Sequence, residues 1–90
     1  SFTVSGLNVT MSLVNFPSNA YGKVILELYG DNTPRTISFN NPNGSIKTDE
    51  NSNWTNASIV VTSIQNPVVV EFWSKNGGST MLAKYVGSFS

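Results

Sequence analysis

The sequence predicts an all-β protein, an antiparallel β-sandwich of about seven strands with an immunoglobulin-like architecture. Apolar residues recur at every second position along the chain and never at the helical spacing of 3.6 residues. Turn signals rich in Gly, Pro, Asn and Asp interrupt these segments about every 8–12 residues, which is typical of a sandwich. Ninety residues are enough for one small core, so we expect residues 1–90 to form a single domain.

The first half of the chain alternates strand-like segments with turns. A strand-like opening, SFTV, is followed by LNVTMSL at residues 7–13, KVILELY at 23–29 and RTISF at 35–39. The turns between and after them, NFPSNAYG, GDNTP and NNPNGS, carry the residues that favour chain reversal. A long polar segment then runs to Asn56, and we expect it to be a connection rather than a strand.

The second half predicts one strand and then a hairpin. ASIVVTSI at residues 57–64 is closed by QNP, after which VVVEFWS at 68–74 and TMLAKYVG at 80–87 flank KNGGS. Asn76-Gly77 supplies the positive φ angles that primed hairpin turns require. The inward phase of all these strands predicts the core: Leu7, Val9, Met11, Leu13, Val24, Leu26, Leu28, Ile37, Phe39, Val70 and Phe72.

Apolar side chains also occupy the opposite phase of several strands. Ile25 and Tyr29 alternate away from the predicted core, and so do Val69 and Trp73. The chain therefore has more apolar side chains than one sandwich core holds, and such a patch exceeds what a solitary soluble domain exposes. We expect a polysaccharide or a neighbouring copy of the chain to cover it.

The composition excludes several classes of partner. Charged residues make up 11% of the chain and cancel to a net charge of zero, so the basic surface that nucleic acid or an anionic membrane attracts is missing. No segment approaches the roughly 18 apolar residues of a membrane span. Cysteine is absent, and Asn, Ser and Thr supply 33 positions. Together with the opening SFTV, this composition favours a secreted, extracellular protein.

An enzyme is not expected, and no cofactor is indicated. The chain has no histidine, so the commonest general base and metal ligand is lacking. Glu27 and Glu71 could form a carboxylate pair, but solvated strand residues that discourage edge aggregation explain them better.

A calcium site is weakly indicated. Asp49-x-Asn51-x-Asn53 matches the start of a calcium loop, and Asp31 could contribute from a neighbouring turn. Trp54 then stands where the loop needs glycine, and Val60 where it needs glutamate. Asx turns in a polar connection account for the same residues.

Four acceptor patterns for N-linked glycans occur in the chain, at Asn8, Asn43, Asn53 and Asn56. A chain with this much Asn, Ser and Thr would contain two or three by chance. All four fall in predicted turns or on the outward phase of a strand, where a glycan can be accommodated. Trp54 lies between two of them, and we expect it to fold back onto the sheet edge or onto a neighbour.

A carbohydrate-binding module is one interpretation of the exposed aromatic residues. Aromatic faces stack on the C–H faces of sugar rings, and a cysteine-poor β-sandwich of this size is a common scaffold for such modules. The stacking candidates are Trp54, Trp73, Tyr21 and Tyr29. The alternative for Trp73 is a half-buried residue of the sheet.

A structural subunit is the favoured interpretation. The neutral Asn/Ser/Thr-rich strands, the acceptor patterns, the lack of Cys and His and the strand-like opening resemble the subunits of secreted archaeal filaments built by donor-strand exchange. The resemblance implies that residues 1–6 leave their own domain and complete the sheet of the next copy, with Ser5-Gly6 as the break. It also implies a glycan-covered surface. The expected subunit interface comprises Phe2, Val4, Ile25, Val69 and Trp73.

Overall fold

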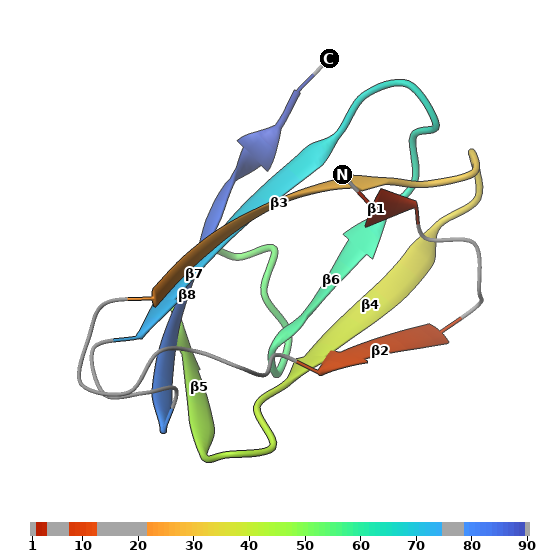
Figure 1. The fold of residues 1–90 in the computed structure, drawn as a ribbon. Coiled ribbons are helices and arrows are strands. Elements are labelled where there is room, and N and C mark those ends of the chain that lie inside the picture. Colours follow the sequence, from red (N-terminus) through yellow and green to blue (C-terminus); the bar gives the residue numbers. More distant parts are fainter. Residues whose placement is uncertain (1, 4–7, 13–21, 75–78, 90) are drawn as a thin grey trace.

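The computed structural model describes residues 2–3, 8–12, 22–74 and 79–89, and this part of the chain contains β-strands and no helix (Figure 1). The strands are β1 (Phe2–Thr3), β2 (Asn8–Ser12), β3 (Gly22–Tyr29), β4 (Arg35–Asn40), β5 (Ser45–Thr48), β6 (Ser58–Val61), β7 (Val68–Ser74) and β8 (Thr80–Ser88). The predicted all-β class is confirmed for these residues. The five strands expected between residues 23 and 87 are present as β3, β4, β6, β7 and β8, and β5 is an addition within the segment predicted to be a connection.

The strands form two sheets that enclose one core. The larger sheet has the order β1-β3-β7-β8-β5, and the smaller one has the order β2-β4-β6. Both sheets are mixed, because β1 and β3, β2 and β4, and β5 and β8 pair in parallel. The prediction of a purely antiparallel sandwich is therefore wrong. β1 and β3 lie side by side because β2 belongs to the other sheet, and β2 and β4 do so because β3 belongs to the other sheet. β5 reaches β8 past β6 and β7.

The core lies between the sheets and contains five of the residues predicted for it, Leu28, Ile37, Phe39, Val70 and Phe72. It also contains six that were not predicted, Ile59, Val61, Val68, Met81, Ala83 and Tyr85. The ladder places Val9 opposite Ile37 and Met11 opposite Phe39. Leu7 and Leu13 lie outside the described residues, and Val24 and Leu26 are only half-buried.

The predicted hairpin joins β7 and β8, which pair antiparallel from Val68–Ser88 to Trp73–Leu82. Asn76-Gly77 lies outside the described residues. The register shifts between Val69 and Val70, which stand opposite Gly87 and Tyr85, so Val86 is an extra residue in β8. This bulge turns Val86 outward while Tyr85 stays in the core.

β5 follows the turn at Asn43-Gly44 and pairs with the first half of β8. Ile46 stands opposite the buried Met81 and packs against the core, whereas exposed Lys47 stands opposite Leu82 on the outer face. A Cβ at Gly44 would lie 1.9 Å from the carbonyl oxygen of Ser79. Only glycine therefore permits the approach that starts this strand.

Candidate functional site

In the part of the chain that the structure describes, the edge of the larger sheet is open along most of β3. β7 pairs with β3 from Gly22 to Leu28, but on the other side β1 covers only Leu28 and Tyr29. Among the described residues, nothing pairs with the outer edge of Gly22–Glu27. Burial follows this coverage: Leu28 is 0% exposed, whereas Val24 and Leu26, on the same inward face, are half-buried. The open length is about 20 Å at 3.3 Å per residue.

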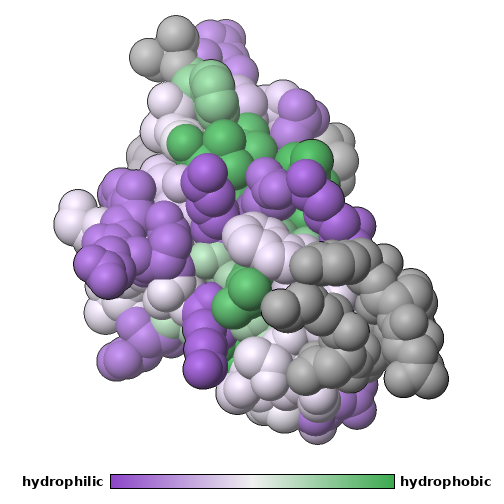
Figure 2. Space-filling view, turned by 90° about the vertical axis from the view of Figure 1, so that its left-hand side faces the viewer, coloured by the Kyte–Doolittle hydropathy of each residue, from purple (hydrophilic) through white to green (hydrophobic). Residues whose placement is uncertain are grey.

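The outer face of this sheet carries the apolar residues expected at an interface. Ile25 is 59% exposed, while Val69 and Trp73 on neighbouring β7 are half-buried. Lys23 stands opposite Trp73, and its Nζ lies 2.9 Å from Oε1 of Glu71. Figure 2, which views this side of the molecule, shows apolar patches between hydrophilic residues. The face is thus partly apolar and carries both signs of charge.

The N-terminal strand does not leave its own domain in this structure. Phe2 stands opposite Leu28 and Thr3 opposite Tyr29 of the same chain. β1 is tethered to the edge that it fills, so this pairing requires no second molecule. The expectation that residues 1–6 complete the sheet of the next copy concerns an assembly, and it stays a prediction. Val4 lies outside the described residues.

Two other sheet edges are protected. β5 is four residues long and carries the exposed Lys47, and both features discourage pairing with another chain. At β6, the backbone N–H and C=O of Ser58 exchange 2.9 Å hydrogen bonds with Thr55. Just beyond β6, the carbonyl of Thr62 accepts a 2.7 Å hydrogen bond from the N–H of Asn32. The open stretch of β3 lacks comparable blocking contacts among the described residues.

Three of the predicted glycan acceptors, Asn43, Asn53 and Asn56, are exposed and lie in turns. Asn8 begins β2, at the edge of the smaller sheet. Asn53 and Asn56 line a groove of about 420 Å³ together with residues of β4 and β6, among them Val60. The placement of these three side chains suits a bulky modification.

Trp54 packs onto the core rather than facing solvent. Its ring meets those of Phe39 and Tyr85 edge to face, with centroids 6.1 and 6.5 Å away. Its Nε1 donates a hydrogen bond to Oδ1 of Asp49. Trp54 therefore folds back onto the sheet, one of the two positions expected for it, and it is half-buried rather than fully exposed.

The other stacking candidates are not brought together. Trp73 stands level with Lys23 at one end of β3, and Tyr29 ends that strand, six residues or about 20 Å away. Tyr21 lies outside the described residues. The described aromatic residues therefore form no shared platform for adjacent sugar rings.

The calcium candidates are also separated. Oδ1 of Asp49 accepts hydrogen bonds from Trp54 and from the backbone N–H of Tyr85. Asn51 accepts from the N–H and Nδ2 of Asn53, which makes an Asx turn. Tyr85, which contacts Asp49, is three residues or about 10 Å along β8 from Ser88. Asp31 follows β3 beyond the level of Ser88, so it lies still further from Asp49. No group of three or more acidic side chains suited to a metal ion occurs in the part of the chain that the structure describes.

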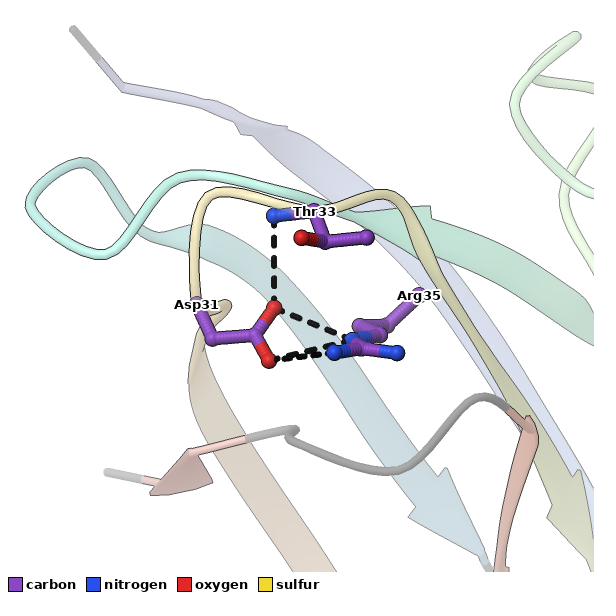
Figure 3. A network of polar contacts seen from close by, with 3 residues as sticks. All are labelled: Asp31, Thr33 and Arg35. Carbon is purple, nitrogen blue, oxygen red and sulfur yellow. Dashed lines mark hydrogen bonds and ion pairs between the residues drawn. The ribbon is translucent and has the colours of Figure 1, made fainter.

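Asp31 instead forms an ion pair with Arg35 across the turn between β3 and β4 (Figure 3). Arg35 donates from Nε to Oδ1 at 3.0 Å and from Nη2 to Oδ2 at 2.7 Å, which is a two-point contact. The hydrogen bond from Arg35 lowers the pKa of Asp31 below its ordinary value. A structural role in this turn accounts for both residues.

In comparisons with known proteins, no family model matches the chain, and no curated protein or solved structure matches it. None of the described residues belongs to a helix long and apolar enough to cross a membrane. The features that bear on function are therefore the sheet edges, the outer face and the acceptor asparagines.

Proposed function

We propose that this protein is a structural subunit of an extracellular, N-glycosylated filament, assembled by exchange of the N-terminal strand between copies. The observation that carries the proposal is the open edge of β3. Its inward residues Val24 and Leu26 are half-buried, whereas Leu28 beside β1 is fully buried. An added strand would complete the burial that the single chain leaves unfinished.

The residues 1–6 of a neighbouring copy have the alternation that this edge requires. Phe2 and Val4 would face the core, and the main chain would supply the ladder of hydrogen bonds that strand addition uses. A displacement along β3 by an even number of residues keeps the same faces inward. Burial of two such side chains contributes about 3–6 kcal/mol before the entropy of ordering.

Exchange to a neighbour's sheet keeps β1 paired with the same strand, β3, in a register moved toward Gly22 that covers Val24 and Leu26. Swapping an identical element between copies is a low-cost route to association. Because each copy gives one strand and receives another at a different surface, the contact does not close and a filament grows. The outer face around Ile25, Val69 and Trp73 would add contact area to that of the strand.

The surface chemistry agrees with this role. Low charge reduces repulsion between closely packed copies, and glycans on the acceptor asparagines would replace charge as the solubilising layer. The proposed architecture is immunoglobulin-like at the level of two facing sheets around a single core. Its partners are copies of itself and N-linked glycans, with no catalytic role.

A pair of cysteines tests strand exchange directly, because the natural chain has none. Moving the register by four residues toward Gly22 brings Thr3 opposite Ile25, so Thr3→Cys and Ile25→Cys would face each other across two copies but not within one chain, where Thr3 pairs with Tyr29. Neighbouring strands hold Cα atoms within the range of a disulfide. Oxidised filaments should yield a ladder of covalent dimers, trimers and longer species in non-reducing electrophoresis. Each single-cysteine variant serves as a control and can yield dimers at most.

Two results would overturn the proposal. Filaments whose cysteines do not link neighbouring copies would show that β1 does not enter the sheet of another copy in this register. A full-length chain that remains monomeric at high concentration would also exclude a filament. Binding of that monomer to an insoluble polysaccharide, lost on Trp73→Ala, would instead support the carbohydrate-binding alternative.

A further inference from the structure

The β6 edge of the smaller sheet has one gap. In an antiparallel strand, residues two apart direct their N–H and C=O groups to the same side. The backbone groups of Ser58 and Thr62 that point away from β4 are hydrogen-bonded, those of Ser58 to Thr55 and the carbonyl of Thr62 to Asn32. Val60, between them, therefore directs its N–H and C=O away from β4, and no hydrogen bond to these groups is found among the described residues.

A groove lies at this gap. Its volume is about 420 Å³, within the range of small-molecule sites, and its walls present hydroxyl and amide groups around the side chain of Val60, which is 55% exposed. The lining residues are Thr36, Asn53, Thr55, Asn56, Ser58, Ile59 and Val60. Such a surface suits a ligand with many hydroxyl groups and apolar C–H faces.

We propose that a glycan attached to Asn53 lies in this groove and caps the β6 edge at Val60. This inference rests on the N-glycosylation that is part of the proposed function. The attachment residue itself lines the groove, so the first sugar is held beside the exposed backbone without any separate binding step. The glycan would close the β6 edge of the smaller sheet to pairing with another chain.

Asn53 is better placed for modification than Asn56, which also lines the groove. The Asn53 pattern ends at the exposed Thr55, whereas the Asn56 pattern ends at Ser58, whose hydroxyl is 2.7 Å from that of Ser38. Asn56 is further fixed in a tight turn by its φ of 50°. The Asn53 side chain is oriented by Asn51, and its Nδ2 keeps one N–H for that hydrogen bond after a sugar replaces the other.

The modification needs a sugar donor of a defined chemical class, a sugar linked through phosphate to a lipid carrier. A bond forms between Nδ2 of Asn53 and C1 of the sugar, while the bond from C1 to the phosphate oxygen breaks. One Nδ2 proton is lost to a base of the transferase, and the lipid phosphate leaves. No oxidant or reductant takes part in this transfer.

The test compares natively produced chain with Asn53→Gln and with Asn43→Gln, which removes an acceptor at the turn before β5. Peptide mass analysis should find a glycan on Asn53. Amide hydrogen exchange at Val60 should be about fivefold or more faster in Asn53→Gln, the effect of losing one hydrogen bond, and unchanged in Asn43→Gln. Filaments of Asn53→Gln should associate side by side, whereas those of Asn43→Gln should stay separate.

An unmodified Asn53 in native protein would overturn the inference, and so would equal exchange at Val60 with and without the glycan. Thr55→Ser, which keeps the acceptor pattern, should behave as wild type. If filaments form but the amide exchange of Val60 does not change when the glycan is lost, the inference about the cap is wrong and the proposed filament stands. If no filament forms while Val60 is protected, the cap stands and the filament proposal fails.

Discussion

The indole Nε1 of Trp54 donates a hydrogen bond to Oδ1 of Asp49, five residues earlier in the chain. The same oxygen accepts a 3.1 Å hydrogen bond from the backbone N–H of Tyr85 in β8. One carboxylate thus joins the polar connection before β6 to the larger sheet. This explains why a large aromatic residue occupies an otherwise polar segment, since its ring covers the core beside Phe39.

Asp49→Ala should lower the free energy of unfolding by about 2–4 kcal/mol, because two N–H donors lose a charged acceptor in a half-buried site. Asp49→Asn keeps a carbonyl oxygen at the same position and should lose less. Urea unfolding followed by tryptophan fluorescence measures both. Equal stability of Asp49→Ala and wild type would show that this carboxylate does not hold the connection.

Ala57→Gly should raise the free energy of unfolding by about 0.5–1 kcal/mol. Ala57 has a φ of 60°, in the left-handed region that costs residues with a Cβ about 1–2 kcal/mol and glycine almost nothing. The acceptor pattern at Asn56 is kept. Ala83→Gly is the matched control: Ala83 is buried in regular strand, so the same change there should destabilise. Thermal unfolding distinguishes the two directions.

Acid should weaken the turn between β3 and β4. The hydrogen bond from Arg35 lowers the pKa of Asp31 in the folded chain below its ordinary value of 3.8. The unfolded chain therefore takes up this proton first, so the stabilisation is complete above pH 3.8 and is lost as the pH falls through the folded pKa. Asp31→Asn should remove this part of the pH dependence in unfolding experiments between pH 7 and 2. Parallel curves for the two proteins would contradict the assignment.

Alternation in the sequence was enough to predict the strands and much of the core. Ile37, Val70 and Phe72 occupy the inward phase of strongly periodic segments, and that phase predicts their burial. β5 was not predicted for two reasons. Its sequence SIKT has one inward apolar residue, Ile46, and its partner strand β8 lies 35 positions further along the chain.

The parallel pairs and the site geometry could not be predicted from local pattern. The neighbours of a strand depend on which of the two sheets it joins. The alternation of apolar and polar residues is the same in either sheet, so it does not predict that choice. The contact between Asp49 and Tyr85 likewise joins segments that no spacing rule connects. The half-burial of Val24 and Leu26 was missed because it depends on how the edge of β3 is covered, and among the described residues β1 covers that edge only at Leu28 and Tyr29.

Leu26→Ala and Leu28→Ala should separate folding from assembly, since both change the same residue type on the same face of β3. Leu28 is fully buried, so Leu28→Ala should lower the free energy of unfolding of the monomer by about 3–4 kcal/mol. Leu26 is half-buried beside the open edge, so Leu26→Ala should lower it by only about 1–2 kcal/mol. Urea unfolding of dilute protein measures these values.

For assembly, Leu26→Ala should have the larger effect and Leu28→Ala the smaller one, the reverse of their effects on stability. The comparison is made under conditions where the monomer of each variant is folded. Leu26 would lie under the strand received from a neighbour, so Leu26→Ala should raise the critical concentration for filaments about tenfold, as expected for a loss of about 1.4 kcal/mol. Leu28 is already covered by β1 in the single chain, and Leu28→Ala should change that concentration less. Sedimentation of filaments across a dilution series gives both values. A larger assembly defect for Leu28→Ala would mean that the open length of β3 is not the edge at which copies join.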